Sequence, residues 1–76
     1  MEIMITIREQ GKEETLILDD GLVIREALRR LAAKGIYSGR AAGCCYVRSR
    51  LCREVLCTVQ SFVAARIVSG DELELI

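Results

Sequence analysis

The sequence contains no histidine and no tryptophan, and its aromatic residues are two tyrosines and one phenylalanine. Without histidine it lacks the commonest general base and the commonest metal ligand of proteins. No imidazole is therefore present to activate a serine as a nucleophile. The glycines between positions 35 and 43 are not followed by the Lys-Ser/Thr pair of a phosphate-binding loop. These absences predict a protein that is not an enzyme and holds no cofactor.

An excess of either charge is also missing, because eleven basic residues balance eleven acidic ones. A protein that neutralises nucleic-acid phosphates needs a positive field, so we expect no nucleic-acid partner. No apolar run reaches the roughly 18–20 residues that span a bilayer, and the N-terminus lacks the basic and apolar regions of a signal peptide. The sequence therefore predicts a cytoplasmic protein that does not insert directly into a membrane.

Hydrophobic residues make up 51% of the 76 positions, enough for one compact core, and we expect a single domain over residues 1–76. The first part alternates, with Ile3, Ile5 and Ile7 on one face of a strand. A glycine-containing turn at residues 10–12 leads to a second strand over Thr15–Leu18, which completes a hairpin.

The period then changes from two residues to that of a helix. Apolar side chains recur at i, i+3, i+4 and i+7, and Gly35 provides a stop; the four residues are Ile24, Ala27, Leu28 and Leu31. Arginines fill the opposite, solvated face. Residues 36–43 indicate a loop, because Ser38-Gly39 and Gly43 break regular structure.

The second half predicts short strands over residues 44–50 and 55–59, an irregular turn around Phe62, and a last strand over residues 72–76. The order is hairpin, helix and two or three more strands. We therefore predict an α+β fold in which a mixed sheet of four to five strands packs on one helix.

This order, ending in Gly70-Asp71-Glu72-Leu73-Glu74-Leu75-Ile76, resembles the ubiquitin-like β-grasp fold. From Tyr46 to Ile76 the chain is similar to the YukD-like (EsaB-like) proteins of bacterial type VII secretion systems. The matching residues are Tyr46-Val47-Arg48, Val55-Leu56, Phe62, Ile67 and the terminal run. The resemblance implies a cytosolic accessory or regulatory factor that supports export of WXG-type substrates through protein–protein contact, with secretion-system components as partners.

A sulfur carrier of thiamin or molybdopterin synthesis is the first alternative. Those β-grasp proteins need a flexible Gly-Gly tail to enter an adenylating enzyme, whereas this sequence stops at Leu75-Ile76 in the expected last strand. We expect that segment to be fixed in the sheet, which disfavours conjugation and sulfur carriage. The alternative predicts a gene that continues past Ile76 into Gly-Gly.

A small metal or iron–sulfur protein is the second alternative, because the chain has four cysteines: Cys44, Cys45, Cys52 and Cys57. Their spacing matches neither the C-x2-C pairs of zinc sites nor the plant-type ferredoxin motif. Neighbouring cysteines on a strand also point to opposite faces. The pattern favours reduced thiols that pack as small apolar side chains.

The expected binding surface is the open sheet face near Arg48, Arg50 and Arg53, where an acidic protein partner could dock. The competing structural interpretation is that Arg48 and Arg50 pair across strands with Glu72 and Glu74. Met4, Tyr46 and Ile76, together with Thr6, would form an apolar patch on the same face. Such patches mark protein contacts or homo-oligomer interfaces.

Overall fold

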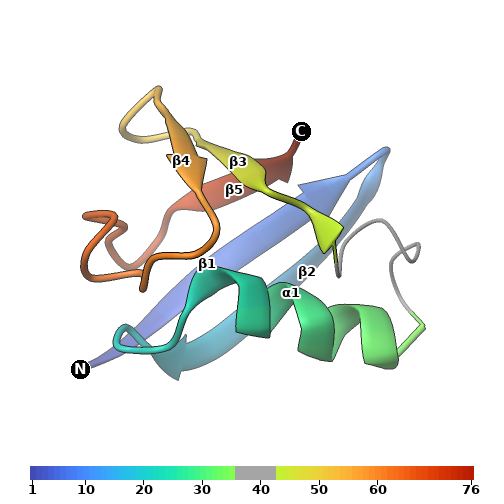
Figure 1. Cartoon of the computed structure of the whole chain (residues 1–76), viewed down its shortest axis with the longest axis horizontal. Coiled ribbons are helices and arrows are strands. Elements are labelled where there is room, and N and C mark those ends of the chain that lie inside the picture. Colours follow the sequence, from blue (N-terminus) through green and yellow to red (C-terminus); the bar gives the residue numbers. More distant parts are fainter. Residues whose placement is uncertain (36–42) are drawn as a thin grey trace.

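The computed structural model describes residues 1–35 and 43–76 of the chain. Within these residues two long strands form a hairpin, one helix follows, and three short strands complete a five-stranded sheet (Figure 1). The loop expected at residues 36–43 lies, apart from Gly43, outside the described residues.

The hairpin joins β1 (Glu2–Glu9) to β2 (Lys12–Asp19), which pair along their whole length with Ile5 opposite Leu16. Gln10 and Gly11 form the two-residue turn with φ angles of 47° and 81°. Positive φ at both positions matches the right-handed twist of the strands, and glycine adopts it without steric cost. The alternation of Ile3, Ile5 and Ile7 is confirmed, since all three are buried. The second strand is longer than predicted, because the hairpin extends its pairing through Lys12–Glu14.

Helix α1 (Ile24–Ala33) buries the four predicted apolar residues against the sheet. It ends at Ala33, Lys34 is its C-cap, and Gly35 follows with a φ of 74°, as is common after a helix. No side chain of the described residues caps its start. Instead the first amides, those of Ile24 and Arg25, donate to the carbonyls of Gln60 and Thr58 at 3.0 and 2.8 Å. The turns after β4 therefore complete the helix N-terminus.

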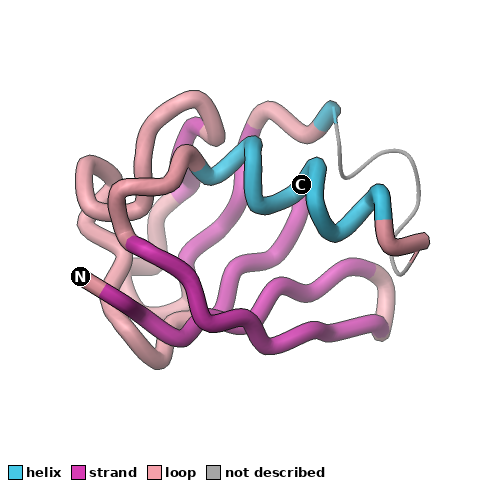
Figure 2. Tube along the Cα trace, turned by 90° about the horizontal axis from the view of Figure 1, so that it is seen from below, coloured by secondary structure: helices cyan, strands magenta, loops and turns pink. Residues whose placement is uncertain are grey.

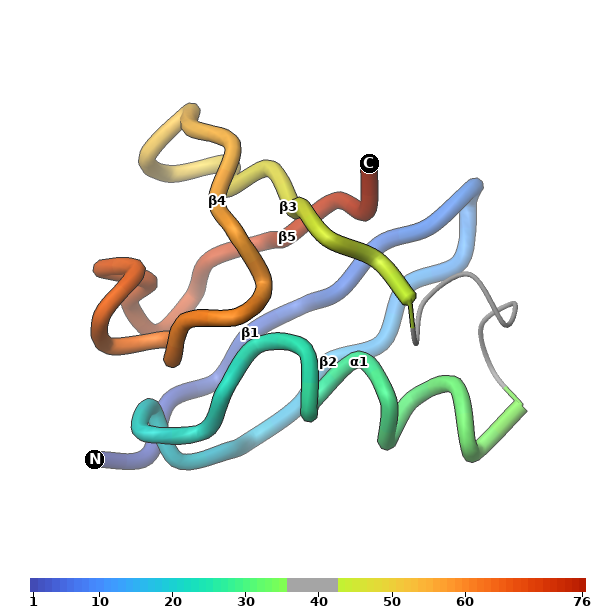
Figure 3. Tube along the Cα trace, viewed as in Figure 1, coloured from blue at the N-terminus to red at the C-terminus, as the bar shows by residue number. Residues whose placement is uncertain are grey.

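The remaining strands are β3 (Tyr46–Ser49), β4 (Val55–Cys57) and β5 (Glu72–Leu75), and the sheet order is β2-β1-β5-β3-β4. The last strand thus lies in the middle of the sheet, parallel to β1 and antiparallel to β3. Leu73 and Leu75 are buried there, as predicted. The trace in Figure 3 shows the red C-terminal strand between the blue first strand and the yellow third strand.

The core lies between α1 and one face of the sheet, and Figure 2 shows the helix on that side of the strands. Phe62 is fully buried in the turns before β5, and Ile67 returns to the core, as predicted. Leu16 and Leu18 are only partly buried because β2 is an edge strand. The architecture is α+β with the element order and mixed sheet expected of a β-grasp.

Candidate functional site

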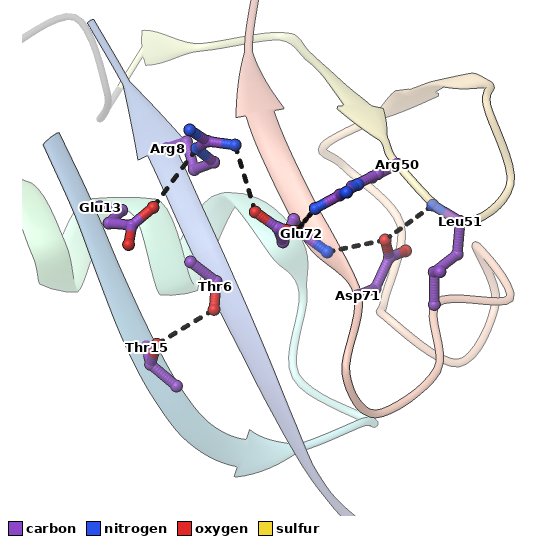
Figure 4. Close-up of polar contacts among 8 residues, drawn as sticks. All are labelled: Thr6, Arg8, Glu13, Thr15, Arg50, Leu51, Asp71 and Glu72. Carbon is purple, nitrogen blue, oxygen red and sulfur yellow. Dashed lines mark hydrogen bonds and ion pairs between the residues drawn. The ribbon is translucent and has the colours of Figure 1, made fainter. Parts of the chain in front are cut away.

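The sheet face turned away from α1 carries a band of charged side chains on the central strands. Glu72 of β5 lies between two arginines (Figure 4). Its Oε1 is 3.2 Å from Nη1 of Arg8, and its Oε2 accepts from Nη1 of Arg50. Arg8 also places its Nε 3.4 Å from Oε2 of Glu13 on β2. These partly exposed pairs each contribute about 0–1 kcal/mol, so they orient side chains more than they stabilise the fold.

Arg48 and Glu74 are the next pair in the band. The β3–β5 register places them directly opposite each other, and the β1–β5 register places Arg8 on the other side of Glu74. Arg48 forms no ion pair with any of the residues that the structure describes. Its exposed guanidinium borders a shallow depression of about 150 Å³, which is lined by Arg8, Arg48, Arg50, Glu72 and Glu74.

Exposed apolar side chains lie near Arg48 on β3, on β4 and directly after β5. Val55 lies opposite Arg48, Cys57 lies opposite Tyr46, and the Ile76 amide donates to the Tyr46 carbonyl at 3.3 Å. The exposed fractions are 53% for Tyr46, 52% for Val55 and 46% for Ile76. We call Tyr46, Arg48, Val55 and Ile76 the Tyr46 surface.

The predicted apolar patch of Met4, Tyr46 and Ile76 is not continuous. Met4 pairs with Ile17 at the other end of the sheet, and its carbonyl accepts from Gly70, which lies in the turn before β5 and six residues before Ile76. Six residues of strand cover about 20 Å. The charged band lies between the two ends, so the patch hypothesis is corrected: the parallel pairing of β1 and β5 separates its members.

The three arginines of the predicted binding surface do not all lie on the open face of the sheet. Arg48 and Arg50 lie on or directly after β3 at the open face, and Arg50 pairs with Glu72 as the structural interpretation expected. Arg53 instead lies in the β3–β4 turn with a φ of 57°, and its amide donates to the Ser49 carbonyl at 2.9 Å. The turn lacks Gly or Asn, so Arg53 itself adopts the left-handed conformation.

Sequence reasoning missed two residues that build the site. Arg8 holds Glu72, and its outward position follows the alternation of β1, a signal that was available. Asp71 is buried at 1% exposure and accepts from the Leu51 amide at 3.1 Å, the Glu72 amide at 2.7 Å and the Ser49 hydroxyl. It thereby fixes the β3–β4 turn to the start of β5. Asp71 precedes Leu73 and Leu75 by two and four residues, and residues at this spacing in a strand lie on the same face. This spacing was the signal that the Asp71 side chain points inward.

The four cysteines are free thiols in different surroundings. Cys44 is buried, and its Sγ donates to the Tyr46 carbonyl at 2.9 Å. Cys45 is exposed, so the two neighbouring side chains point in opposite directions, as predicted. Cys52 lies in the β3–β4 turn and Cys57 is half-buried on β4. Among residues 1–35 and 43–76, no three His, Cys, Asp or Glu side chains lie together in a group that could hold a metal ion.

No helix in the described parts of the chain is long and apolar enough to cross a membrane.

Known structures share this architecture across the whole chain. The UBL domain of Plasmodium falciparum Dsk2 is 15% identical with a TM-score of 0.67, covering 100% of both chains. A protein designed de novo on the basis of ubiquitin is 20% identical with a TM-score of 0.75, covering 99% of this chain and 87% of the other. The fold is ubiquitin-like. An N-terminal ubiquitin-like domain solved in solution agrees at 9% identity and a TM-score of 0.71, with 99% and 73% covered.

Comparisons by sequence give no match, because neither a protein-family model nor a curated protein matches this chain. The ubiquitin-like fold predicted from the sequence is confirmed. The finer similarity to the YukD-like family stays a prediction.

Proposed function

We propose that this chain is a non-enzymatic ubiquitin-like module that binds a protein partner through the Tyr46 surface and the adjoining charged band. The observation that carries the proposal is Arg48, a guanidinium without an ion-pair partner in the described residues that is flanked by exposed Tyr46 and Val55. Tyrosine and arginine are enriched among residues that dominate binding energy at interfaces. The surface therefore has the composition of a docking site.

The geometry indicates what the partner presents. A carboxylate on the partner would form a charge-assisted, two-pronged contact with Arg48, since Arg8 and Arg50 are already engaged by Glu72. An apolar partner side chain beside it would cover Tyr46 and Val55. We therefore propose a partner with an acidic and an aliphatic or aromatic residue close together.

Type VII secretion is the specific setting that we propose for this contact. The similarity of Tyr46–Ile76 to YukD-like proteins supports a bacterial cytosolic accessory factor that contacts secretion-system components. The stretch that carries this similarity also contains all four residues of the Tyr46 surface.

The experiment is affinity capture from native bacterial lysate, with quantitative mass spectrometry, using wild type and the Arg48→Glu/Arg50→Glu variant. The matched control is Arg29→Glu/Arg66→Glu, which makes the same change of charge at exposed positions of α1 and of the turns before β5. We expect the sheet variant to lose the main partners and the control variant to keep them. Circular dichroism of each variant verifies the fold.

Equal capture by both variants would contradict docking at the Tyr46 surface. A set of partners that depends on Arg48 but includes no secretion component would contradict only the type VII setting. The two parts of the proposal are thus tested separately.

A further inference from the structure

Strand β2 forms one of the two outer edges of the sheet, and half of its backbone groups have no neighbouring strand. The Met4 carbonyl and the Thr6 amide of β1 bond to the chain at Gly70 and Asp71. The odd-numbered residues of β1 therefore bond to β2, where their partners are even-numbered, such as Leu16 and Leu18. This pattern leaves the N–H and C=O groups of Thr15 and Ile17 directed away from the sheet.

A groove runs beside this edge, between β2 and α1. It has a volume of about 180 Å³, which is comparable with six water molecules at about 30 Å³ each and suits aliphatic side chains. Its walls are mainly apolar and include Leu16, Leu18, Leu22, Ala27 and Leu31. Ile17, on the open-face side of the same edge, is 69% exposed. Natural edge strands are usually protected by charge, proline or a bulge, and Thr15–Leu18 has none of these.

The charges at the groove have one sign. Arg30 of α1 and Lys34, the C-cap of the helix, line it, and no acidic side chain of the described residues does. Arg30 is 3.8 Å from Glu26, which lies outside the groove, and Lys34 forms no ion pair within residues 1–35 and 43–76. On β2, Glu13 and Glu14 precede the apolar stretch, and charged side chains on an edge strand disfavour pairing with another strand. The groove is therefore complementary to an acidic segment.

We propose that an extended acidic segment of a partner protein adds to β2 as a sixth strand along Thr15–Leu18. Its backbone would bond to Thr15 and Ile17, and alternate side chains would enter the groove because a strand alternates between the two faces of a sheet. The segment therefore alternates aliphatic and polar residues and carries acidic residues beside Arg30 and Lys34. This surface is separate from the Tyr46 surface and does not depend on it.

The probe is a synthetic capped heptapeptide: aspartate and glutamate followed by valine, threonine, valine, threonine and valine. Titration into the 15N-labelled chain, followed by NMR, should shift the amides of Thr15 and Ile17. At saturation we expect hydrogen exchange of these two amides to slow about tenfold or more, because they gain bonds to the peptide. The amides of Leu16 and Leu18 already bond to β1 and should exchange as before.

Two variants test the assignment. Thr15→Pro removes an outward N–H at an edge position, where proline leaves the backbone bonds between β1 and β2 intact and only the side-chain bond to Thr6 is lost, and it should abolish peptide binding. Arg30→Gln/Lys34→Gln should weaken binding about fivefold through two exposed charges. The control Arg29→Gln/Arg53→Gln loses the same charge outside the groove and should stay within about twofold.

Several outcomes would overturn the proposal. These are no shifts at about millimolar peptide, shifts centred on β3 and β5, or equal binding of a peptide with proline at its centre. Equal binding of a peptide that begins with two lysines would refute the charge assignment. Slow, concentration-dependent exchange of Thr15 and Ile17 without peptide would show that a second copy of the chain occupies the edge.

Discussion

Asp71 provides the sharpest test of how the open face is held in place. Its carboxylate accepts from the hydroxyl of Ser49 and from the amides of Leu51 and Glu72. The Ser49 Oγ in turn accepts from the Cys52 amide at 3.2 Å. Replacing Asp71 by asparagine preserves its shape but removes the charge and turns one acceptor oxygen into a donor.

The magnitude follows from the three contacts. A hydrogen bond to a charged group contributes about 1.5–3 kcal/mol, and an unsatisfied buried group costs about 1–3 kcal/mol. We expect Asp71→Asn to lower the free energy of unfolding by about 2 kcal/mol and Asp71→Ala by about 3–5 kcal/mol. A chain of 76 residues has about 4–11 kcal/mol in total. The alanine variant is therefore close to unfolding, and the asparagine variant is the informative one.

Thermal and urea unfolding followed by circular dichroism measure this loss. A loss of about 2 kcal/mol corresponds to a fall in Tm of about 8–16 °C for a domain of this size. Asp20→Asn is the matched control, because Asp20 contacts the exposed amino group of Met1, and it should cost less than about 1 kcal/mol. A loss below about 0.5 kcal/mol for Asp71→Asn would refute the view that this carboxylate fixes the β3–β4 turn to β5.

Four further results are expected. Phe62→Ala should lower the free energy of unfolding by about 3–5 kcal/mol, measured by urea titration, because the ring is fully buried. Gly70→Ala should cost about 1–2 kcal/mol in the same assay through its φ of 93°, since a methyl group there would meet no atom within 4 Å. The hydrogen bond to Asp20, with the charge of Asp19, raises the pKa of the Met1 amino group above 8.0. The stabilisation from this contact is therefore complete below pH 8.0 and is lost as pH rises through the raised pKa; NMR titration of Asp20→Asn should show the pKa move back down. Finally, Arg48→Glu should leave the dissociation constant of the acidic peptide within about twofold when NMR titration is done at about 0.15 M salt.

The local patterns of the sequence predicted the elements well because each depends on its own residues. Two local patterns place apolar side chains on one face of their element: the alternation of Ile3, Ile5 and Ile7, and the helical spacing of Ile24 and Leu31. Burial of that apolar face determines the structure of each element. The last strand was predicted for the same reason.

Features that depend on pairing between distant strands were harder to predict. Whether Met4 lies beside Ile76 depends on the parallel register of β1 and β5, which no local pattern encodes. The division of the arginines has a similar origin, since Arg53 leaves the strand in a turn that lacks the usual glycine. The buried Asp71 was missed because its partners lie 20 and 22 residues away.

The arrangement of the sheet explains why two surfaces can act independently. The core occupies one face, so side chains for recognition remain on the open face and backbone groups remain at the β2 edge. Strands β1 and β5 lie between β2 and β3, and three spacings of about 4.8 Å separate the two surfaces by about 14 Å. This exceeds the screening length of about 8 Å at physiological salt, so a charge on one surface has little influence on binding at the other. A partner at the Tyr46 surface and an extended segment at β2 could therefore be held together, with the rigid pair β1–β5 setting the distance between them.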